Sequence, residues 1–273
     1  MWGKTMWGGT MIDDIEETID WQGNPVDCSR CEHLDINATG KCRLSHACVN
    51  DRYARRIDRF FHWNPALANS YLTHPHFEVR AIASKHAAVF LLLPLLDDPE
   101  ETVRWNAARR LPKKHILKLR NDPHREVRIR IVSLLDDADL VPMLQDKDYY
   151  VRLVIARRLE PHLLEWMLHD EEAEVRRVVA QRVPDDMLMR MAGDPEARVR
   201  LEVAQRLTGE RLSQMRSDPD WRVRYEAACR VELEELGELA DDSDDLVREM
   251  VFSRLGGLET LGRDDGIGEG GPL

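Results

Sequence analysis

The chain has 273 residues, and a composition of 43% hydrophobic and 33% charged residues is typical of a globular protein rather than a disordered one. A formal net charge of −11 makes it a poor general binder of nucleic acid, because contacts to phosphate dominate that affinity. The longest apolar run, residues 89–96, is interrupted by Pro94 and is too short to span a bilayer, and no signal-peptide pattern opens the chain. These features predict a cytoplasmic protein with no membrane contact.

Motifs and composition divide the chain into four segments. Residues 1–24 contain tryptophan, glycine and acidic residues without a clear period, and we expect a mobile leader there. A cysteine-bearing domain with a connecting basic helix follows at residues 25–73, and a repeat region occupies residues 74–258. Residues 259–273 are rich in glycine and acidic residues and are predicted to form a disordered tail.

Four cysteines form the first motif. They are Cys28, Cys31, Cys42 and Cys48, with two, ten and five residues between them. Cysteines grouped in this way in a cytoplasmic protein indicate metal or redox chemistry rather than disulfides. The Cys-x-x-Cys pair lets two thiolates converge from one tight turn, and the other two can close a four-thiolate shell. Such a shell suits zinc, a single iron or an iron–sulfur cluster.

The residues around the cysteines leave zinc open as an alternative. Arg30, Lys41 and Arg43 are expected to lower the pKa values of the thiols and to offset the charge of a negative cluster. A structural zinc site is usually built from two Cys-x-x-Cys knuckles, and the last gap of five residues fits that form poorly. His33 and His46 could serve as zinc ligands, but with four cysteines present we interpret them as bystanders.

Residues 50–63 (NDRYARRIDRFFHW) have the pattern of a basic amphipathic helix, with Asn50 or Asp51 as its cap. We expect its apolar side chains to pack between the cysteine domain and the first repeat. These side chains are Tyr53, Ile57, Phe60 and Phe61.

The dipeptide Val-Arg recurs eight times at intervals of 24 residues, which identifies a repeat protein. The valines are Val79, Val103, Val127, Val151, Val175, Val199, Val223 and Val247. An aspartate stands five residues before the valine in every unit but the first, where His74 replaces it, and proline often follows. Asp-Pro predicts a helix start, because the carboxylate can cap free amides and proline fits the first turn.

Apolar residues recur eight, thirteen and sixteen residues after each valine. Each unit is therefore predicted to contain one helix of about three turns and a shorter helical segment. The pattern as a whole predicts an all-α solenoid of eight 24-residue repeats, whose units bury their apolar faces against neighbouring units. Cys229 lies alone within one repeat helix and is interpreted as a small buried hydrophobe.

The arginine of each Val-Arg pair falls inside the apolar arc of its helix, because successive residues are about 100° apart. A buried guanidinium needs carboxylate or carbonyl partners, and the repeated aspartate of the same or the next unit is the obvious one. We therefore predict a structural Asp–Arg ladder rather than a basic binding surface.

A second arginine, seven residues after the valine, lies at the edge of the apolar arc. This edge set is Arg110, Arg158, Arg182, Arg206, Arg230 and Arg254, while the first and third units carry His86 and Leu134 there. The edge set is the better candidate for an exposed binding stripe, although a solvated flank is the plainer interpretation.

A four-cysteine head followed by 24-residue units of the form Asp-Pro-x-x-x-Val-Arg resembles the leucine-rich repeat variant proteins over roughly residues 25–258. The resemblance implies a right-handed superhelix of alternating α- and 3₁₀-helices and a [4Fe–4S] cluster in a small N-terminal domain. It also implies that Cys28, Cys31, Cys42 and Cys48 are the cluster ligands. Similar proteins occur in nitrogen-fixing bacteria, and the resemblance supplies no biochemical activity.

No nucleophile–base pair, zinc-hydrolase motif or cofactor fingerprint is present, so neither catalysis by the repeats nor a small-molecule substrate is predicted. Three hypotheses remain. The first is a protein-interaction scaffold whose cluster provides electron transfer, redox sensing or oxygen sensing to a bound partner. The second is a structural head, holding a cluster or zinc, that caps a protein-binding solenoid. The third is a solenoid that binds nucleic acid through the edge arginines.

Overall fold

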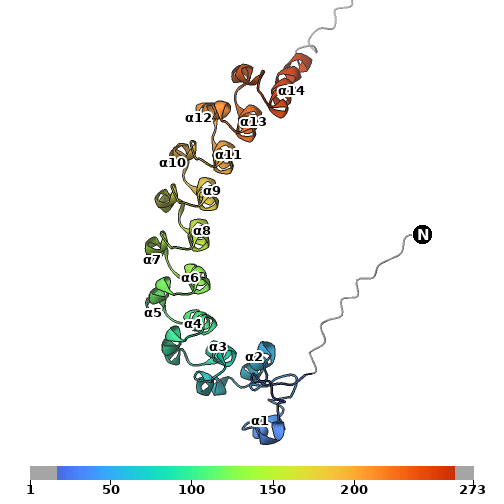
Figure 1. Ribbon diagram of the computed structural model, residues 1–273, viewed down its shortest axis with the longest axis vertical. Coiled ribbons are helices and arrows are strands. Elements are labelled where there is room, and N and C mark those ends of the chain that lie inside the picture. The colour runs from blue at the N-terminus through green and yellow to red at the C-terminus, as the bar shows by residue number, and fades with distance from the viewer. Residues whose placement is uncertain (1–16, 262–273) are drawn as a thin grey trace, which may run out of the picture. The chain divides into compact units, whose positions relative to one another are not determined.

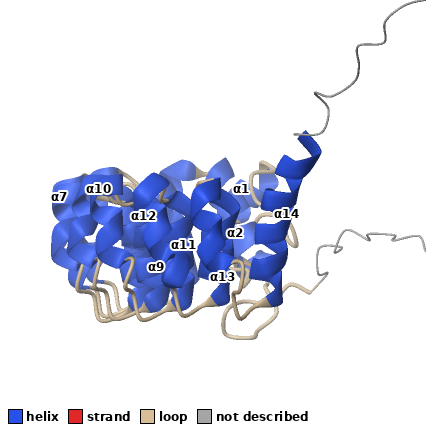
Figure 2. Ribbon diagram, turned by 90° about the horizontal axis from the view of Figure 1, so that it is seen from above, coloured by secondary structure: helices blue, strands red, loops and turns tan. Residues whose placement is uncertain are grey.

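The computed structural model describes residues 17–261, with side chains described as far as residue 256. The predicted tail beyond residue 261 and residues 1–16 of the predicted leader lie outside the described residues. The chain divides into two compact units with the boundary between Asp136 and Asp137. Throughout the described residues, helices are joined by loops and no strand is present (Figure 2).

The first unit contains the cysteine domain and the first repeats. Its cysteine domain holds η1 (Cys28–Arg30), α1 (Leu34–Ala38), α2 (Ala54–Trp63) and η2 (Pro65–Tyr71). Its repeat helices are α3 (Phe77–His86), η3 (Val89–Leu91), η4 (Leu93–Asp97), α4 (Glu101–Ala108), α5 (Lys113–Ile116), η5 (Leu117–Asn121), α6 (Arg125–Ile131) and η6 (Val132–Leu134). Helices α3, α4 and α6 follow one another in a row, and the shorter segments form a second row beside them (Figure 1).

The second unit consists of repeats alone and has the same two rows (Figure 1). Its longer helices are α8 (Tyr149–Arg158), α9 (Ala173–Arg182), α11 (Ala197–Arg206), α13 (Trp221–Arg230) and α14 (Asp245–Leu261). Its shorter helices are α7 (Asp137–Leu140), η7 (Val141–Met143), η8 (Pro161–Met167), α10 (Asp185–Leu188), η9 (Met189–Met191), α12 (Gly209–Ser213), η10 (Gln214–Ser217) and η11 (Leu233–Leu239).

The predicted apolar positions form the core of both units. Every valine of the Val-Arg pairs is at most 1% exposed, and so is each apolar residue thirteen positions later. The latter residues are Leu92, Ile116, Leu140, Leu164, Leu188, Leu212 and Leu236. Each unit of 24 residues thus places one α-helix and one short helical segment against its neighbours, as the sequence pattern predicts.

Most arginines of the Val-Arg pairs are buried and form the predicted ladder, whereas Arg248 of the last unit is partly exposed and pairs with Asp245. Arg104, Arg152, Arg176 and Arg200 are 4–9% exposed. In each pair, Nε and Nη2 of the arginine donate to the two carboxylate oxygens of the aspartate 18 residues ahead, at 2.7–3.0 Å. Within the two described units these pairs are Arg80–Asp98, Arg104–Asp122, Arg152–Asp170, Arg176–Asp194, Arg200–Asp218 and Arg224–Asp242.

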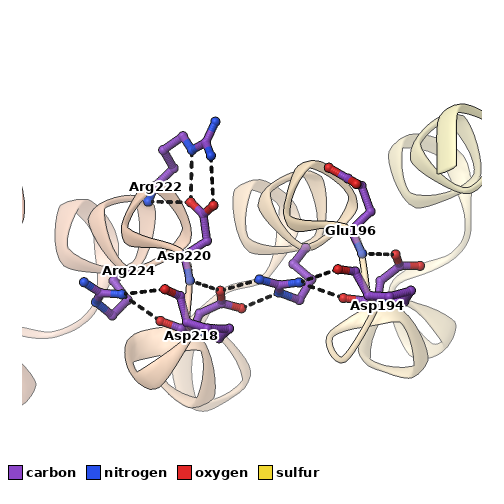
Figure 3. A network of polar contacts seen from close by, with 9 residues as sticks. Asp194, Glu196, Asp218, Asp220, Arg222 and Arg224 are labelled. Atoms are coloured by element: carbon purple, nitrogen blue, oxygen red, sulfur yellow. Dashed lines mark hydrogen bonds and ion pairs between the residues drawn. The ribbon is translucent and has the colours of Figure 1, made fainter.

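Each guanidinium of the ladder also donates to a backbone carbonyl of its own repeat, as the surroundings of Asp218 show (Figure 3). Arg224 Nη1 donates to the carbonyl of Asp218 at 2.9 Å, while the Asp218 carboxylate accepts from Arg200 and from the amide of Asp220 at 2.8 Å. Each aspartate therefore joins two arginines and the start of its own helix. The bidentate geometry makes these the stronger kind of charge-assisted hydrogen bond.

The predicted Asp-Pro helix start is wrong by two positions. In the unit of α13, the helix begins at Trp221 and its N-cap is Asp220, two residues after Asp218. The carboxylate of Asp218 accepts the Asp220 amide in a turn that precedes the helix, and Pro219 lies in that turn. The aspartate does not cap the helix because its carboxylate binds the arginine of the preceding repeat.

The edge arginines form a second, unpredicted ladder. The Nη1 group of Arg206 donates to the carbonyl oxygens of Ala180 and Val183 at 2.8 and 2.7 Å, at the end of the preceding repeat's α9. Four further members of the edge set bind carbonyls at the same place in the preceding repeat: Arg110, Arg182, Arg230 and Arg254. The interpretation of this set as an exposed binding stripe is therefore wrong for these five side chains, which cap helix C-termini.

Part of the segment predicted as a leader belongs to the cysteine domain. Ile19 forms an antiparallel bridge with Pro25 and its carbonyl accepts the amide of Arg52 at 3.0 Å. The carbonyl of Glu17 accepts Nη1 of Arg56 at 2.9 Å. Residues 17–24 are therefore held against the following domain. None of the described helices is both long and apolar enough to cross a membrane.

Candidate metal centre

The first pair of cysteines lies on a short 3₁₀ turn. Asp27 caps this turn, because its carboxylate accepts the backbone amide of Ser29 at 2.9 Å. The amide of Cys31 donates to the carbonyl of Cys28 at 3.4 Å and closes the turn. Residues three apart nearly eclipse in a 3₁₀-helix, so the Cys-x-x-Cys spacing places both side chains on one side of the backbone.

The second pair flanks a tight reversal of the chain. Arg43 and Ala47 form an isolated antiparallel bridge, with N···O distances of 2.9 and 2.8 Å. Ser45, at the tip, has a φ of 61° in the left-handed region, which a non-glycine residue rarely adopts. Cys42 and Cys48 stand immediately outside the bridge, and both are buried. The gap of five residues, which fits a zinc knuckle poorly, is thus the length of this reversal.

The two pairs converge on one another. A side-chain hydrogen bond joins Cys42 to Cys48, and it lowers the pKa of Cys42 while raising that of Cys48. Burial raises the pKa of Cys28, and repulsion from Cys48 and Cys31 raises it further. Cys42 in turn interacts electrostatically with Cys31 and Cys28. Each of the four predicted ligands therefore interacts with at least two of the other three through hydrogen bonding or electrostatic repulsion.

Nitrogen donors point at the sulfur atoms. The backbone amide of His33 and the Nδ2 group of Asn50 both donate to Sγ of Cys31, each at 3.4 Å. The backbone amide of Asn50 bonds Cys48 and opposes the rise in the pKa of that thiol. Such N–H···S bonds stabilise thiolates and tune the potential of iron–sulfur clusters. Asn50 was predicted only as a helix cap, and its position two residues after Cys48 is the signal for this second role.

The predicted helix after the cysteines starts later than expected. It begins at Ala54, not at residue 50, because Asp51 forms a buried ion pair with Arg56 at 2.7 Å and also accepts the amide of Tyr53. Ile57, Phe60 and Phe61 are fully buried, as predicted.

The two histidines near the cysteines are occupied by other partners. His33 is buried and its Nε2 hydrogen-bonds the hydroxyl of Tyr71, which also donates to Glu32 at 2.8 Å. Burial raises the pKa of Tyr71, and the bond to Glu32 adds to this shift. His46 Nδ1 lies 2.8 Å from Nη1 of Arg59. Tyr71 was not predicted from the sequence, since it lies 40 residues after Cys31.

Arg30, one of the three cations next to the cysteines, does not act as predicted. The side chain of Arg30 is 89% exposed and pairs with Asp27 at 3.7 Å. The pKa values of Cys28 and Cys48 are raised rather than lowered, by burial and by the neighbouring thiols. Crowding of this kind favours a cationic centre between the sulfurs, because a metal stabilises the thiolate form.

The donor set fits a group with four thiolate positions. It consists of sulfur alone, it is partly buried, and N–H groups donate to Cys31 and Cys48. Within residues 17–261, no three His, Cys, Asp or Glu side chains come together tightly enough to hold a single metal ion. Cys229 lies in α13 of the second unit, where it is half-buried and burial raises its pKa.

Comparison with known proteins agrees with this geometry. Residues 18–70 match the family model described as the LRV protein FeS4 cluster. A solved structure, a leucine-rich repeat variant with a novel repetitive protein structural motif, is similar to this chain with 41% identity and a TM-score of 0.78. The match covers 84% of this chain and 98% of that one.

The chain belongs to the leucine-rich repeat variant family. The predicted fold class, an all-α solenoid of 24-residue repeats with a small cysteine domain, is thereby confirmed, and the family model indicates an FeS4 cluster. A curated relative, an uncharacterized 27.7 kDa protein in the nifB 3′ region of Rhodobacter capsulatus, is 46% identical over 99 residues. The match covers 36% of this chain and 40% of the relative, so the chain spans well under two thirds of that relative's length.

Proposed function

We propose that this protein is an interaction scaffold that carries a redox-active or oxygen-sensing [4Fe–4S] cluster. The convergence of four thiols on a 3₁₀ turn and a tight reversal is the observation that carries the proposal. The FeS4 family match over residues 18–70 supports iron–sulfur over zinc, which remains the runner-up.

Cys28, Cys31, Cys42 and Cys48 would hold the cluster. A bound cluster of this kind supplies a centre that gains or loses one electron. The chain's own contribution is to place two thiolates by each turn and to donate N–H groups to Cys31 from His33 and Asn50. Tyr71 interacts electrostatically with Cys31 and Cys48 and packs on the buried ring of Phe61, so these two rings would help to keep water from the site.

The repeats supply the scaffold in this proposal. Their buried arginines bind aspartates and carbonyls of the same solenoid, so the ladder leaves the outer surface of the helices available for partners. The position of the relative in a nifB 3′ region supports a link to nitrogen fixation. The carbonyl-bound edge arginines speak against the nucleic-acid alternative, which relied on them.

The test is the iron and acid-labile sulfide content of protein purified without oxygen. We expect equal amounts of iron and sulfide and a broad visible absorption that dithionite bleaches. The Cys42→Ser variant should lack both, whereas Cys229→Ser, altered in a repeat helix, should retain them. Colourless protein with one tightly bound zinc would refute the cluster.

A structural cap is a second candidate, and one observation favours it. The cysteine domain packs on the first repeat: Asp58 of α2 lies 3.2 Å from Lys85 of α3, and the ring of Phe61 contacts that of His86. A purely structural cluster would resist both dithionite and air, and its removal would unfold the first repeats. A redox or sensing cluster should instead change state reversibly while the helical content stays constant.

A further inference from the structure

One junction between repeats in the first unit carries two arginines that form no ion pair with any of the described residues. Trp105 and Arg109 lie on α4, and Arg130 lies on the next long helix, α6. The guanidinium carbons of Arg109 and Arg130 lie 5.8 and 5.6 Å from the centre of the Trp105 ring. Both arginine side chains are exposed, and within residues 17–261 neither has an ion-pair partner.

The repeat register provides an internal reference for this junction. The residues 72 positions later are Arg177 and Gln181 on α9 and Glu202 on α11. There, Glu202 accepts Nε2 of Gln181 at 2.7 Å and lies 3.8 Å from Nε of Arg177. At the junction of the second unit, Glu202 therefore binds the neighbouring polar side chains. The equivalent position in the first unit holds Arg130, a second cation.

The arrangement around Trp105 leaves hydrogen-bond donors available. An indole face attracts a guanidinium and orders its plane, but it accepts none of the five N–H groups. An incoming carboxylate could bind either arginine through two parallel hydrogen bonds.

We propose that Trp105, Arg109 and Arg130 form a docking site for an acidic segment of a partner protein. The inference rests on the proposed scaffold role of the repeats, but not on the redox behaviour of the cluster. Carboxylate side chains of the segment bind the two guanidiniums, and an apolar neighbour packs on the exposed part of the indole.

The charge of the chain favours an acidic protein over a nucleic acid. Two unpaired arginines suffice for a few carboxylates, but binding along a phosphate backbone usually requires several cations. The net charge of −11 repels a long polyanion as a whole, while a short acidic segment meets only the local positive field.

The test measures fluorescence anisotropy of a labelled oligoglutamate peptide titrated with the intact, cluster-loaded protein. Arg109→Gln with Arg130→Gln should weaken binding about tenfold, because both exposed carboxylate–guanidinium pairs are lost. Arg130→Glu should abolish binding, because it places a carboxylate at this junction, as Glu202 does in the second unit. Arg157→Gln is the matched control and should leave binding unchanged. Arg157 is exposed and occupies the position of Arg109 in a later repeat. There, Leu153 and Val178 replace Trp105 and Arg130.

Two results would overturn the proposal. One is oligoglutamate affinity that is the same for wild type and for the Arg109/Arg130 double variant. The other is an oligothymidylate of equal charge that binds more tightly than the peptide through the same arginines, which would identify a nucleic-acid site. Glu202→Arg gives an independent check, since it should create oligoglutamate binding in the second unit of the double variant.

The two proposals fail separately. Iron and sulfide are measured in the same preparations as the anisotropy. Loss of peptide binding with cluster content intact removes the docking site alone, and peptide binding by a protein that never holds iron removes the cluster alone.

Discussion

The repeats and the cysteine domain both bury polar groups, but they satisfy them in different ways. In the second unit, Arg200 binds Asp218 of the next repeat and the carbonyl of Asp194 in its own. The thiols of Cys42 and Cys48 are hydrogen-bonded chiefly to each other, and this bond lowers the pKa of Cys42 and raises that of Cys48. A repeat therefore completes its polar network with its neighbour, whereas in the function proposed above a bound cluster completes that of the cysteine domain.

This difference indicates where function lies in the molecule. Val-Arg is the most conspicuous motif of the sequence, yet most of its arginines are buried and bound to aspartates and carbonyls of the repeats themselves. We expect function where polar groups are not bound within the solenoid. These places are the four cysteines, which precede the repeats, and the junction of Trp105, Arg109 and Arg130.

The largest expected effect comes from removing a buried thiol. Cys48→Ser should eliminate iron and sulfide binding almost completely, because serine is a poor ligand for iron and the remaining three thiols leave one position open. Iron and sulfide analysis measures this, and circular dichroism measures the helical content. The helical content of the repeats should remain, since their ladders do not involve the cysteines. A variant that retains its iron would show that Cys48 is not a ligand.

Breaking the first ladder should have the next largest effect. Arg200→Met leaves the carboxylate of Asp218 buried without its guanidinium, which typically costs about 3–5 kcal/mol. Urea unfolding followed by circular dichroism gives the total loss, and hydrogen exchange should localise it to α11 and α13. Adding Asp218→Asn should recover part of the loss, because asparagine removes the unpaired charge and still accepts the Asp220 amide. Equal stability of the single variant and wild type would contradict a structural ladder.

Breaking the second ladder should cost less. Arg206→Ala removes the guanidinium from two neutral acceptors, the carbonyls of Ala180 and Val183, and from the exposed carboxylate of Asp185, so no buried charge is left unpaired. We expect a loss of about 1–2 kcal/mol in the free energy of unfolding by urea. Arg206→Lys should recover only part of this, since an ammonium reaches two carbonyls less well than a planar guanidinium. A neutral Arg206→Ala variant would return the edge arginines to the list of candidate binding residues.

The sequence allowed most of the repeat architecture to be predicted, because the same pattern recurs in every unit. It placed the core valines and the buried arginines correctly, but not the helix start at Trp221 or the role of Arg206. Both depend on a neighbouring repeat: the Asp218 carboxylate is held by Arg200, and the Arg206 guanidinium by carbonyls of α9. A helical wheel describes one helix in isolation and cannot show contacts of this kind.

The cysteine domain was predictable in composition but not in geometry. The spacing identified four thiols that could share one centre, yet the turn at Ser45 depends on a left-handed conformation that glycine would have signalled and serine does not. The donors to Cys31 come from a backbone amide and from Asn50, and no ligand motif records them.

The smallest predicted effect is the pH dependence of the stability that the ion pair of Arg224 and Asp242 contributes. Hydrogen bonds from Arg224 hold the pKa of Asp242 below its ordinary value, against the opposing effect of burial. The stability from this pair is therefore fully present above the ordinary pKa of aspartate, and it is lost as the pH falls through the lower pKa of the folded state. Asp242→Asn keeps the acceptor for the Asp244 amide and should cost about 1 kcal/mol at neutral pH. Urea unfolding of both proteins at several pH values should show their difference shrinking only in strong acid. A difference that instead shrinks between pH values near neutral would mean that a group other than this carboxylate controls the stability of the last repeats.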